Sequence, residues 1–325
     1  MQARVLCTIG IACLLVLTTT GATAQSDYPS KPMRLVHGFT PGGISDTLAR
    51  ALGAKLTTSL GQQVVVEPRS GAGTTIASDL IAKSAPDGYS LFLQDITTHC
   101  INASLYRQLP YDSVRDFTPI TLIAASPLML IVHPSLPAKS VKELIGLARK
   151  RPGEINHGSS GNGTIVHLAA EMLKSMAGVK MVHVPYKGSP QVVAALLGGE
   201  VAVSFATVPP VLPNMKAGKL RVLGVTTPQR SSAAPNIPTM KEAGLQDFEL
   251  VLYTGILGPR GMPRAIVERL NGEFAKAVQF PDVQAIYSRV GAVAVSGSPD
   301  EFAAHIRSEM DKLGKLVQLS GARIN

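Results

Sequence analysis

Short apolar segments alternate with amphipathic ones along most of the chain. An apolar run over 33–39 ends at a Pro-Gly-Gly turn, and leucines then recur every four residues from Leu48 to Leu60. This spacing predicts a strand and then a helix that begins near Ser45 and ends at Gly61. The same alternation predicts further strands at 64–66, 89–93, 128–132, 182–184, 201–205 and 220–226, and helices at 75–84, 141–151, 165–176, from 190, from 263 and from 299. It is typical of βαβ units and predicts an α/β protein with largely parallel sheets.

The first 24 residues are typical of a secretory signal peptide. Arg4 precedes an apolar run from Val5 to Leu17, and Ala22-Thr23-Ala24 provides a small-residue cleavage site before Gln25. The run is shorter than the roughly 18 residues that a membrane-spanning helix needs. We therefore expect cleavage after residue 24 and export of residues 25–325.

The chain carries a formal charge of +9, with 31 Lys and Arg against 22 Asp and Glu. Such a charge favours an anionic partner, which could be nucleic acid, a membrane surface or a small ligand. The basic residues are dispersed rather than interleaved with aromatic ones, and the chain is expected to be exported, so nucleic acid is excluded as a partner. After cleavage Cys100 is the one cysteine left, so the fold must rest on its core rather than on disulfides.

Three loops rich in glycine and hydroxyl residues stand directly before predicted helices, at 40–45, 159–164 and 187–190. A helix N-terminus leaves about four N–H groups unpaired and carries roughly half a positive charge. Glycine lets an anion approach the backbone, and serine and threonine add donors. One such loop is ordinary capping. Three of them, divided between two successive α/β segments, predict a site that holds a small carboxylate from two sides.

Motifs for other chemistry are incomplete. Gly71-Ala72-Gly73 lacks the last small residue of a dinucleotide fingerprint, and Gly158–Asn162 lacks the final glycine of a nucleophile elbow. His157 and His167 lack the i, i+4 spacing of a helical zinc pair. We therefore expect no cofactor, no metal and no enzymatic activity. A secreted serine hydrolase that uses Ser159 or Ser160 remains the alternative from a different class.

At these loops the chain resembles the tripartite tricarboxylate transporter substrate-binding proteins, also called the Bug family. The resemblance runs from Tyr28 nearly to the C-terminus. Its signatures are Phe39–Gly43 with Asp46, Glu67–Gly73, Ala85–Tyr89, Tyr111-Asp112 with Asp116-Phe117, Gly158–Gly161, His183–Gly188 and Pro238–Met240 with Glu242–Gly244.

The resemblance implies a periplasmic binding protein of type 2, with two α/β lobes joined by a two-strand hinge in the manner of a Venus flytrap. Lobe 1 would comprise 25–125 plus 250–325, and lobe 2 would comprise 126–249. Such a protein is a monomer that captures an organic carboxylate between its lobes and delivers it to membrane permease subunits. A periplasmic sensory module, whose closed form binds a sensor protein, would look the same in sequence.

The resemblance also implies ligand-binding residues, carried over by motif. In lobe 1 these are Phe39, Thr40, Gly42, Gly43, Ser45, Asp46 and, on a following loop, Thr97. In lobe 2 they are Ser159, Ser160, Asn162, Gly163, Thr164, Tyr186 and Lys187. Asp46 also fits a structural role as a helix cap or turn support, and Tyr186 and Lys187 could instead mark a strand end.

One departure from the family bears on the ligand. Many members carry acidic residues in the strand that matches 201–206, where this chain has Ala202 and Ala206. An acid at the later position could pair with a ligand ammonium. Its absence favours an organic acid without an amino group, whether a dicarboxylate, a tricarboxylate or an aromatic carboxylate.

Overall fold

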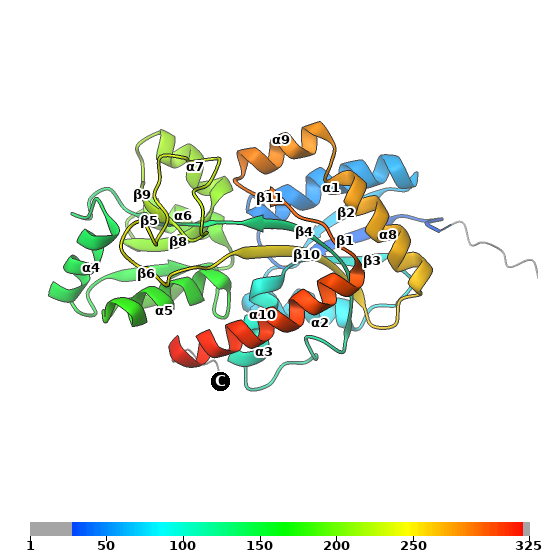
Figure 1. Cartoon of the computed structure of the whole chain (residues 1–325), viewed down its shortest axis with the longest axis horizontal. Coiled ribbons are helices and arrows are strands. Elements are labelled where there is room, and N and C mark those ends of the chain that lie inside the picture. Colours follow the sequence, from blue (N-terminus) through cyan, green and yellow to red (C-terminus); the bar gives the residue numbers. More distant parts are fainter. Residues whose placement is uncertain (1–27, 321–325) are drawn as a thin grey trace, which may run out of the picture.

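The computed structural model describes residues 28–320, with side chains to residue 318, and the predicted signal peptide lies outside this range. Within it the strands form two sheets, one in each lobe (Figure 1). The sheet of lobe 1 has the order β11-β4-β10-β3-β1-β2. Its strands are β1 (Met33–His37), β2 (Val64–Pro68), β3 (Ser90–Asp95), β4 (Phe117–Ser126), β10 (Leu252–Pro259) and β11 (Val293–Ala294). The sheet of lobe 2 has the order β7-β6-β8-β5-β9. Its strands are β5 (Leu128–Val132), β6 (Asn156–Ser159), β7 (Val182–Pro185), β8 (Val203–Thr207) and β9 (Arg221–Val225).

Helices cover both sheets. Those of lobe 1 are α1 (Ile44–Leu60), α2 (Thr75–Ala82), α3 (Ile96–Leu105), α8 (Arg264–Ala277), α9 (Pro281–Arg289) and α10 (Pro299–Ser320). Those of lobe 2 are α4 (Val141–Lys150), α5 (Ile165–Ala177), α6 (Ser189–Leu197) and α7 (Val208–Lys216). The long C-terminal helix α10 packs on α3 and reaches α5 of the other lobe.

The chain crosses between the lobes twice, and the two crossings lie side by side (Figure 1). The first is the β4–β5 junction at Pro127, and the second leads back from β9 to β10. At the junction the N–H of Leu128 donates to the hydroxyl of Thr226 at 3.0 Å, and the N–H of Thr226 donates to the carbonyl of Leu128. This paired crossing supplies the hinge, while the lobe boundaries at 125/126 and 249/250 stay a prediction.

Both sheets are mixed, so the expectation of largely parallel sheets was wrong. Parallel pairing joins β1 to β2 and β3, and β6 to β7 and β8. By contrast β10 runs antiparallel to β3 and β4, and β5 runs antiparallel to β8 and β9. A parallel neighbour needs a crossover connection, usually a helix. Strand β10, which returns from lobe 2, and strand β5, which enters it, each lie between two strands that run the opposite way.

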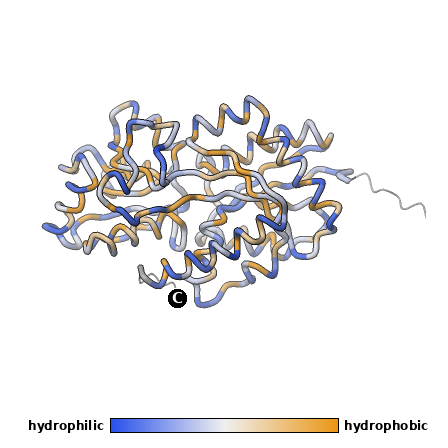
Figure 2. Tube along the Cα trace, viewed as in Figure 1, coloured by the Kyte–Doolittle hydropathy of each residue, from blue (hydrophilic) through white to orange (hydrophobic). Residues whose placement is uncertain are grey.

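The core of each lobe lies between its sheet and its helices, and Figure 2 shows apolar segments along the strands. Helix α1 follows the predicted pattern, because Leu48, Leu52 and Leu56 are at most 1% exposed. Helix α3 was not predicted, and Thr97 lies in its first turn rather than on a loop. Every residue from Ile96 to Asn102 is buried, so this helix has no polar face that a periodicity could reveal.

Candidate functional site

A narrow cavity lies between the two lobes. Its lobe 1 wall comes from the β1–α1 turn, the start of α3 and strand β10: Phe39, Gly43, Ile44, Ser45, Asp95 and Leu252. Its lobe 2 wall comes from the starts of α5, α6 and α7: Ser160, Ile165, Val166, Ser189, Pro190 and Thr207. The cavity measures about 20 Å³, which is room for one or two water molecules. The lobes therefore lie close together in this structure.

Five helix N-termini from residues 28–320 meet at this cavity, those of α1, α3, α5, α6 and α7. Two of them carry side-chain caps, since Asp95 caps α3 and Thr164 caps α5. No side chain among the described residues caps α1, α6 or α7. Uncapped N–H groups at a buried helix end need a partner. Their convergence forms an electropositive site that suits an anion.

Hydroxyl groups line the lobe 2 wall. The hydroxyl of Ser160 donates to that of Thr164 at 3.0 Å, and that of Ser189 accepts from the N–H of Thr207 at 3.2 Å. The hydroxyl of Thr207 is buried and has no hydrogen-bond partner within the described part of the chain. A buried polar group without a partner is costly, so Thr207 is a strong candidate for ligand contact.

One acid faces the cavity. Asp95 is 1% exposed, and its carboxylate accepts from both the N–H and the hydroxyl of Thr98. Burial raises the pKa of Asp95 to about 6, although the hydrogen bonds from Thr98 and from the Thr97 N–H pull it down. No Lys, Arg or His of the described residues lines the cavity beside it.

Hydrogen bonds already connect the lobes across the cleft. The N–H of Ile165, at the start of α5, donates to the hydroxyl of Thr98 at 3.0 Å. The hydroxyl of Tyr106 lies 3.4 Å from the carbonyl of Asn162, to which it donates. Asp95, Thr98 and Ile165 thus form a chain that leads from the cavity into the opposite lobe.

A larger pocket, of about 350 Å³, lies beside the inner cavity and shares Phe39 and Ser160 with it. Both lobes line this outer pocket, through Ala72 and Tyr106 on one side and Asn162, Tyr186 and Lys187 on the other. Lys187 is exposed, and its ammonium makes no ion pair with any described residue. The outer pocket can therefore hold the part of a ligand that the inner cavity cannot contain.

Half of the predicted site residues line one of the two spaces. Phe39, Gly43, Ser45 and Ser160 line the inner cavity, and Phe39, Ser160, Asn162, Tyr186 and Lys187 line the outer pocket. The other predicted residues line neither: Thr40, Gly42, Asp46, Thr97, Ser159, Gly163 and Thr164.

Several of those seven residues make contacts that support the walls. The carboxylate of Asp46 accepts from the N–H of Gly42 at 3.0 Å and from Arg50 at 2.9 Å, which supports the turn before α1. Burial raises the pKa of this carboxyl, but Arg50 and Gly42 outweigh burial and hold the pKa below its ordinary value. The hydroxyl of Thr97 bridges the hinge strand, since it donates to Val251 and accepts from the N–H of Tyr253.

Two glycines of the site lie where atoms of the other lobe come close to the backbone. A Cβ at Gly188 would overlap the hydroxyl of Thr40 in the other lobe. One at Gly163 would lie 2.6 Å from the side-chain oxygen of Asn102, again across the cleft. These glycines allow the lobes to approach, in addition to exposing the backbone.

The sequence reasoning missed Asp95, Ile165, Val166 and Thr207, whereas Ser189 and Pro190 lie in the predicted 187–190 loop. Thr207 is followed by Val208-Pro209, and proline in the first turn is a known helix-start signal. Asp95 occupies the N-cap position of α3, but a sequence reader can identify this cap only after recognising the helix.

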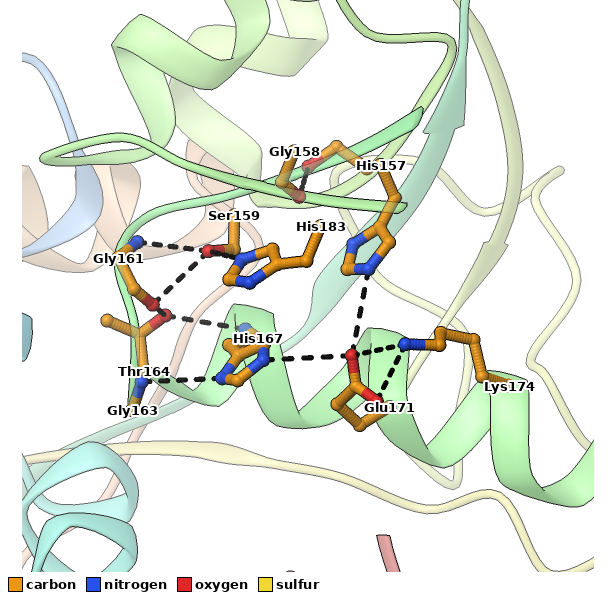
Figure 3. Close-up of polar contacts among 11 residues, drawn as sticks. His157, Gly158, Ser159, Gly161, Gly163, Thr164, His167, Glu171, Lys174 and His183 are labelled. Carbon is orange, nitrogen blue, oxygen red and sulfur yellow. Dashed lines mark hydrogen bonds and ion pairs between the residues drawn. The ribbon is translucent and has the colours of Figure 1, made fainter. Parts of the chain in front are cut away.

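Three histidine rings stack behind the β6–α5 loop that carries Ser160 (Figure 3). The ring of His183 lies between the other two, with centroids 4.1 Å from His167 and 4.9 Å from His157. The carboxylate of Glu171 lies 3.7 Å from the Nε2 atoms of His157 and His167 and binds Lys174 at 2.7 Å. Among residues 28–320 no group of three or more His, Cys, Asp or Glu side chains could hold a metal ion.

Two rings of the stack, those of His167 and His183, are neutral at pH 7. Burial lowers the pKa of His167 to about 4, and burial together with the two neighbouring histidines lowers that of His183 to about 3. The Nε2 atom of His183 lies 2.6 Å from the hydroxyl of Ser159, which also bonds to Gly161. The neutral imidazole of His183 thus supports the loop from behind.

Two α/β lobes that meet at a cavity ringed by helix N-termini define a two-lobed solute-binding protein. The profile of the tripartite tricarboxylate transporter family receptors matches residues 48–322. The chain belongs to this family, whose members include the Bug proteins, and it is a periplasmic-type solute receptor. No helix within the described residues is long and apolar enough to cross a membrane.

Particular relatives are similar over almost their whole length. Protein BugT of Bordetella pertussis is 34% identical over 327 residues, which cover 99% of both chains. The structure of R. palustris Rpa4515 with adipate is 36% identical, with a TM-score of 0.88 over 92% of this chain and all of that one. The structure of MatC from Rhodopseudomonas palustris with bound malate is 28% identical, with a TM-score of 0.85 over 89% of this chain and all of that one.

Proposed function

We propose that this receptor captures a small organic carboxylate between its lobes. The observation that carries the proposal is the set of uncapped N-termini of α1, α6 and α7 at one cavity. They offer hydrogen-bond donors from both lobes without a fixed positive charge. The adipate and malate bound by two structural relatives are dicarboxylates, which agrees with this chemistry.

The closed cleft then supports a transport cycle. The chain is exported after cleavage at residue 24, binds its ligand in the periplasm, and presents the closed form to the permease subunits of a tripartite tricarboxylate-type transporter. A cavity of about 20 Å³ does not admit an organic acid from outside. The lobes must first separate about the paired crossing, and binding shifts the equilibrium toward the closed form.

Isothermal titration of residues 25–325 tests the proposal. Mono-, di- and tricarboxylates are compared with matched neutral amides of the same carbon skeleton. We expect at least one carboxylate to bind with a Kd in the micromolar range or below and its amide not to bind. Binding of another ligand class, with no affinity for any carboxylate, would end the proposal.

The contact between Ser159 and His183 is the one observation that favours a serine hydrolase. Two features count against it. Ser159 is fully buried and lines neither space, and a histidine whose pKa is about 3 is a weak general base at pH 7. Ser160, which does line both spaces, bonds to a threonine rather than to a base. We propose that the protein is not an enzyme, and a serine-directed phosphonate probe should leave it unlabelled.

A further inference from the structure

Asp95 is the exception in a cavity otherwise built to attract an anion. Its carboxylate is part of the wall, whereas no Lys, Arg or His of residues 28–320 lines the same space. A ligand carboxylate placed there meets helix ends on most sides and a like charge on one side. The group of the ligand that faces Asp95 must therefore be something other than an ionised carboxylate.

The carboxylate of Asp95 has acceptor capacity to spare. Its two oxygens offer about four lone-pair positions. Donors to it are the N–H and hydroxyl of Thr98 and the N–H of Thr97. One position remains for a donor from the cavity. A ligand hydroxyl fits this position, since it donates a hydrogen bond and brings no charge of its own.

We propose that Asp95 is the specificity-determining residue of the inner cavity, and that it selects small carboxylates bearing a hydroxyl group over the same acids without one. This inference rests on the proposed function, because it assumes that a carboxylate occupies the cavity. The alcohol donates to the free acceptor position of Asp95, while the ligand carboxylate faces the helix ends. An acid without the hydroxyl leaves Asp95 buried, charged and next to a second anion.

The environment of Asp95 sharpens this preference. Burial raises its pKa to about 6, so at pH 7 to 8 it is largely ionised but easily protonated. The titratable group that faces it from α3 is the thiol of Cys100, whose pKa burial raises and which stays neutral. An acid without the hydroxyl group can then bind only as Asp95 takes up a proton. The affinity of the wild-type protein for such an acid should therefore fall by up to about tenfold per pH unit above pH 6.

The test compares matched pairs of acids by isothermal titration at pH 7.5. The pairs are acetate and glycolate, propionate and lactate, and succinate and malate, with alanine and aspartate as amino counterparts. We expect the hydroxy acid of the best-fitting pair to bind at least about tenfold more tightly than its partner in the wild type. In Asp95→Asn the Oδ1 atom can still cap α3, but the charge is gone, and the two acids of the pair should bind within about twofold of each other.

Asp112→Asn provides the matched control. Asp112 also accepts from backbone N–H groups, those of Val114 and Arg115, but it lies on an exposed turn outside the cleft. It should keep the wild-type preference. If Asp95→Asn is too unstable to titrate, the fall in affinity of the unsubstituted acid between pH 6 and pH 8, measured in the wild type, supplies the same answer.

The outcomes separate the two proposals. If no carboxylate binds the wild type, the proposed function fails and the preference fails with it. If carboxylates bind but the members of each pair bind equally, the receptor stands and the role of Asp95 is overturned. A preference for the amino acids over the hydroxy acids, or a hydroxyl preference that persists in Asp95→Asn, also overturns it.

Discussion

Among the described residues, the side chains that line the inner cavity are uncharged, apart from that of Asp95. The net charge of +9 is therefore spread elsewhere, and an anion is held by backbone ends and hydroxyls. Ser160 and Thr207 supply hydroxyls from lobe 2, and Gly43 and Ser45 open α1 from lobe 1. Fixed dipoles of this kind need no charged side chain to be ordered when the ligand arrives.

The buried carboxylate of Asp95 should lower the free energy of unfolding when it is ionised. Its folded pKa of about 6 exceeds its ordinary value of 3.8, so the folded state holds the proton more tightly. Stability is therefore lost as pH rises through 6. We expect Asp95→Asn to raise the free energy of unfolding by about 2 kcal/mol at pH 8 and to have little effect at pH 4. Urea denaturation at both pH values measures this.

The exposed turn again provides the control for that measurement. Hydrogen bonds from Arg115 and Val114 hold the pKa of Asp112 below its ordinary value, so Asp112→Asn should not stabilise the protein at pH 8. An Asp95→Asn variant that is less stable than the wild type at pH 8, or whose gain persists at pH 4, contradicts the assignment.

At the scale of elements, the site depends on where helices begin and on how closely the two lobes approach. The sequence predicted the β1–α1 and β6–α5 turns because glycine and serine precede amphipathic helices there. It could not reveal α3, in which residues 96–102 are all buried, nor which residues of distant turns share one cavity. Thr97 shows the difference, since a residue assigned to ligand binding instead bonds to the hinge strand.

Gly188 should affect ligand binding only because a larger side chain there would collide with the other lobe. Its φ of 170° is extended backbone that any residue adopts, so alanine introduces no backbone strain. A Cβ there would overlap the hydroxyl of Thr40 and hold the lobes apart. We expect Gly188→Ala to weaken carboxylate binding about tenfold with little change in thermal stability. Isothermal titration and calorimetric unfolding test the two parts.

Gly146→Ala is the corresponding control. Gly146 lies within α4, and a Cβ there would meet nothing within 4 Å. This substitution should stabilise the helix by about 1 kcal/mol and leave ligand affinity unchanged. Unchanged affinity in Gly188→Ala as well would show that the Gly188–Thr40 approach has no part in closure.

At the scale of the whole molecule, the buried histidines should make stability sensitive to acid. Burial lowers the pKa of His37, His99, His167, His183 and His305, to about 4 for His99 and His167. The unfolded chain binds these protons near pH 6.5 and the folded protein does not. Stability is thus fully present above pH 6.5 and is lost as pH falls toward 4.

We expect the free energy of unfolding to fall by on the order of 3 kcal/mol between pH 7 and pH 4.5. Asp95 opposes this trend between pH 6 and 3.8, so the fall should be steeper in Asp95→Asn. Urea denaturation at half-unit intervals provides the profile. A wild-type profile that stays flat from pH 7 to 4.5 would show that the histidines are not held neutral by burial.

The most direct test of the account is a crystal structure of residues 25–325 with the tightest carboxylate from the titrations. The account predicts a ligand carboxylate between the lobes, within hydrogen-bond distance of N–H groups at the start of α1 and at the start of at least one of α5, α6 and α7. A carboxylate bound to lysine or arginine side chains away from these helix ends would contradict it.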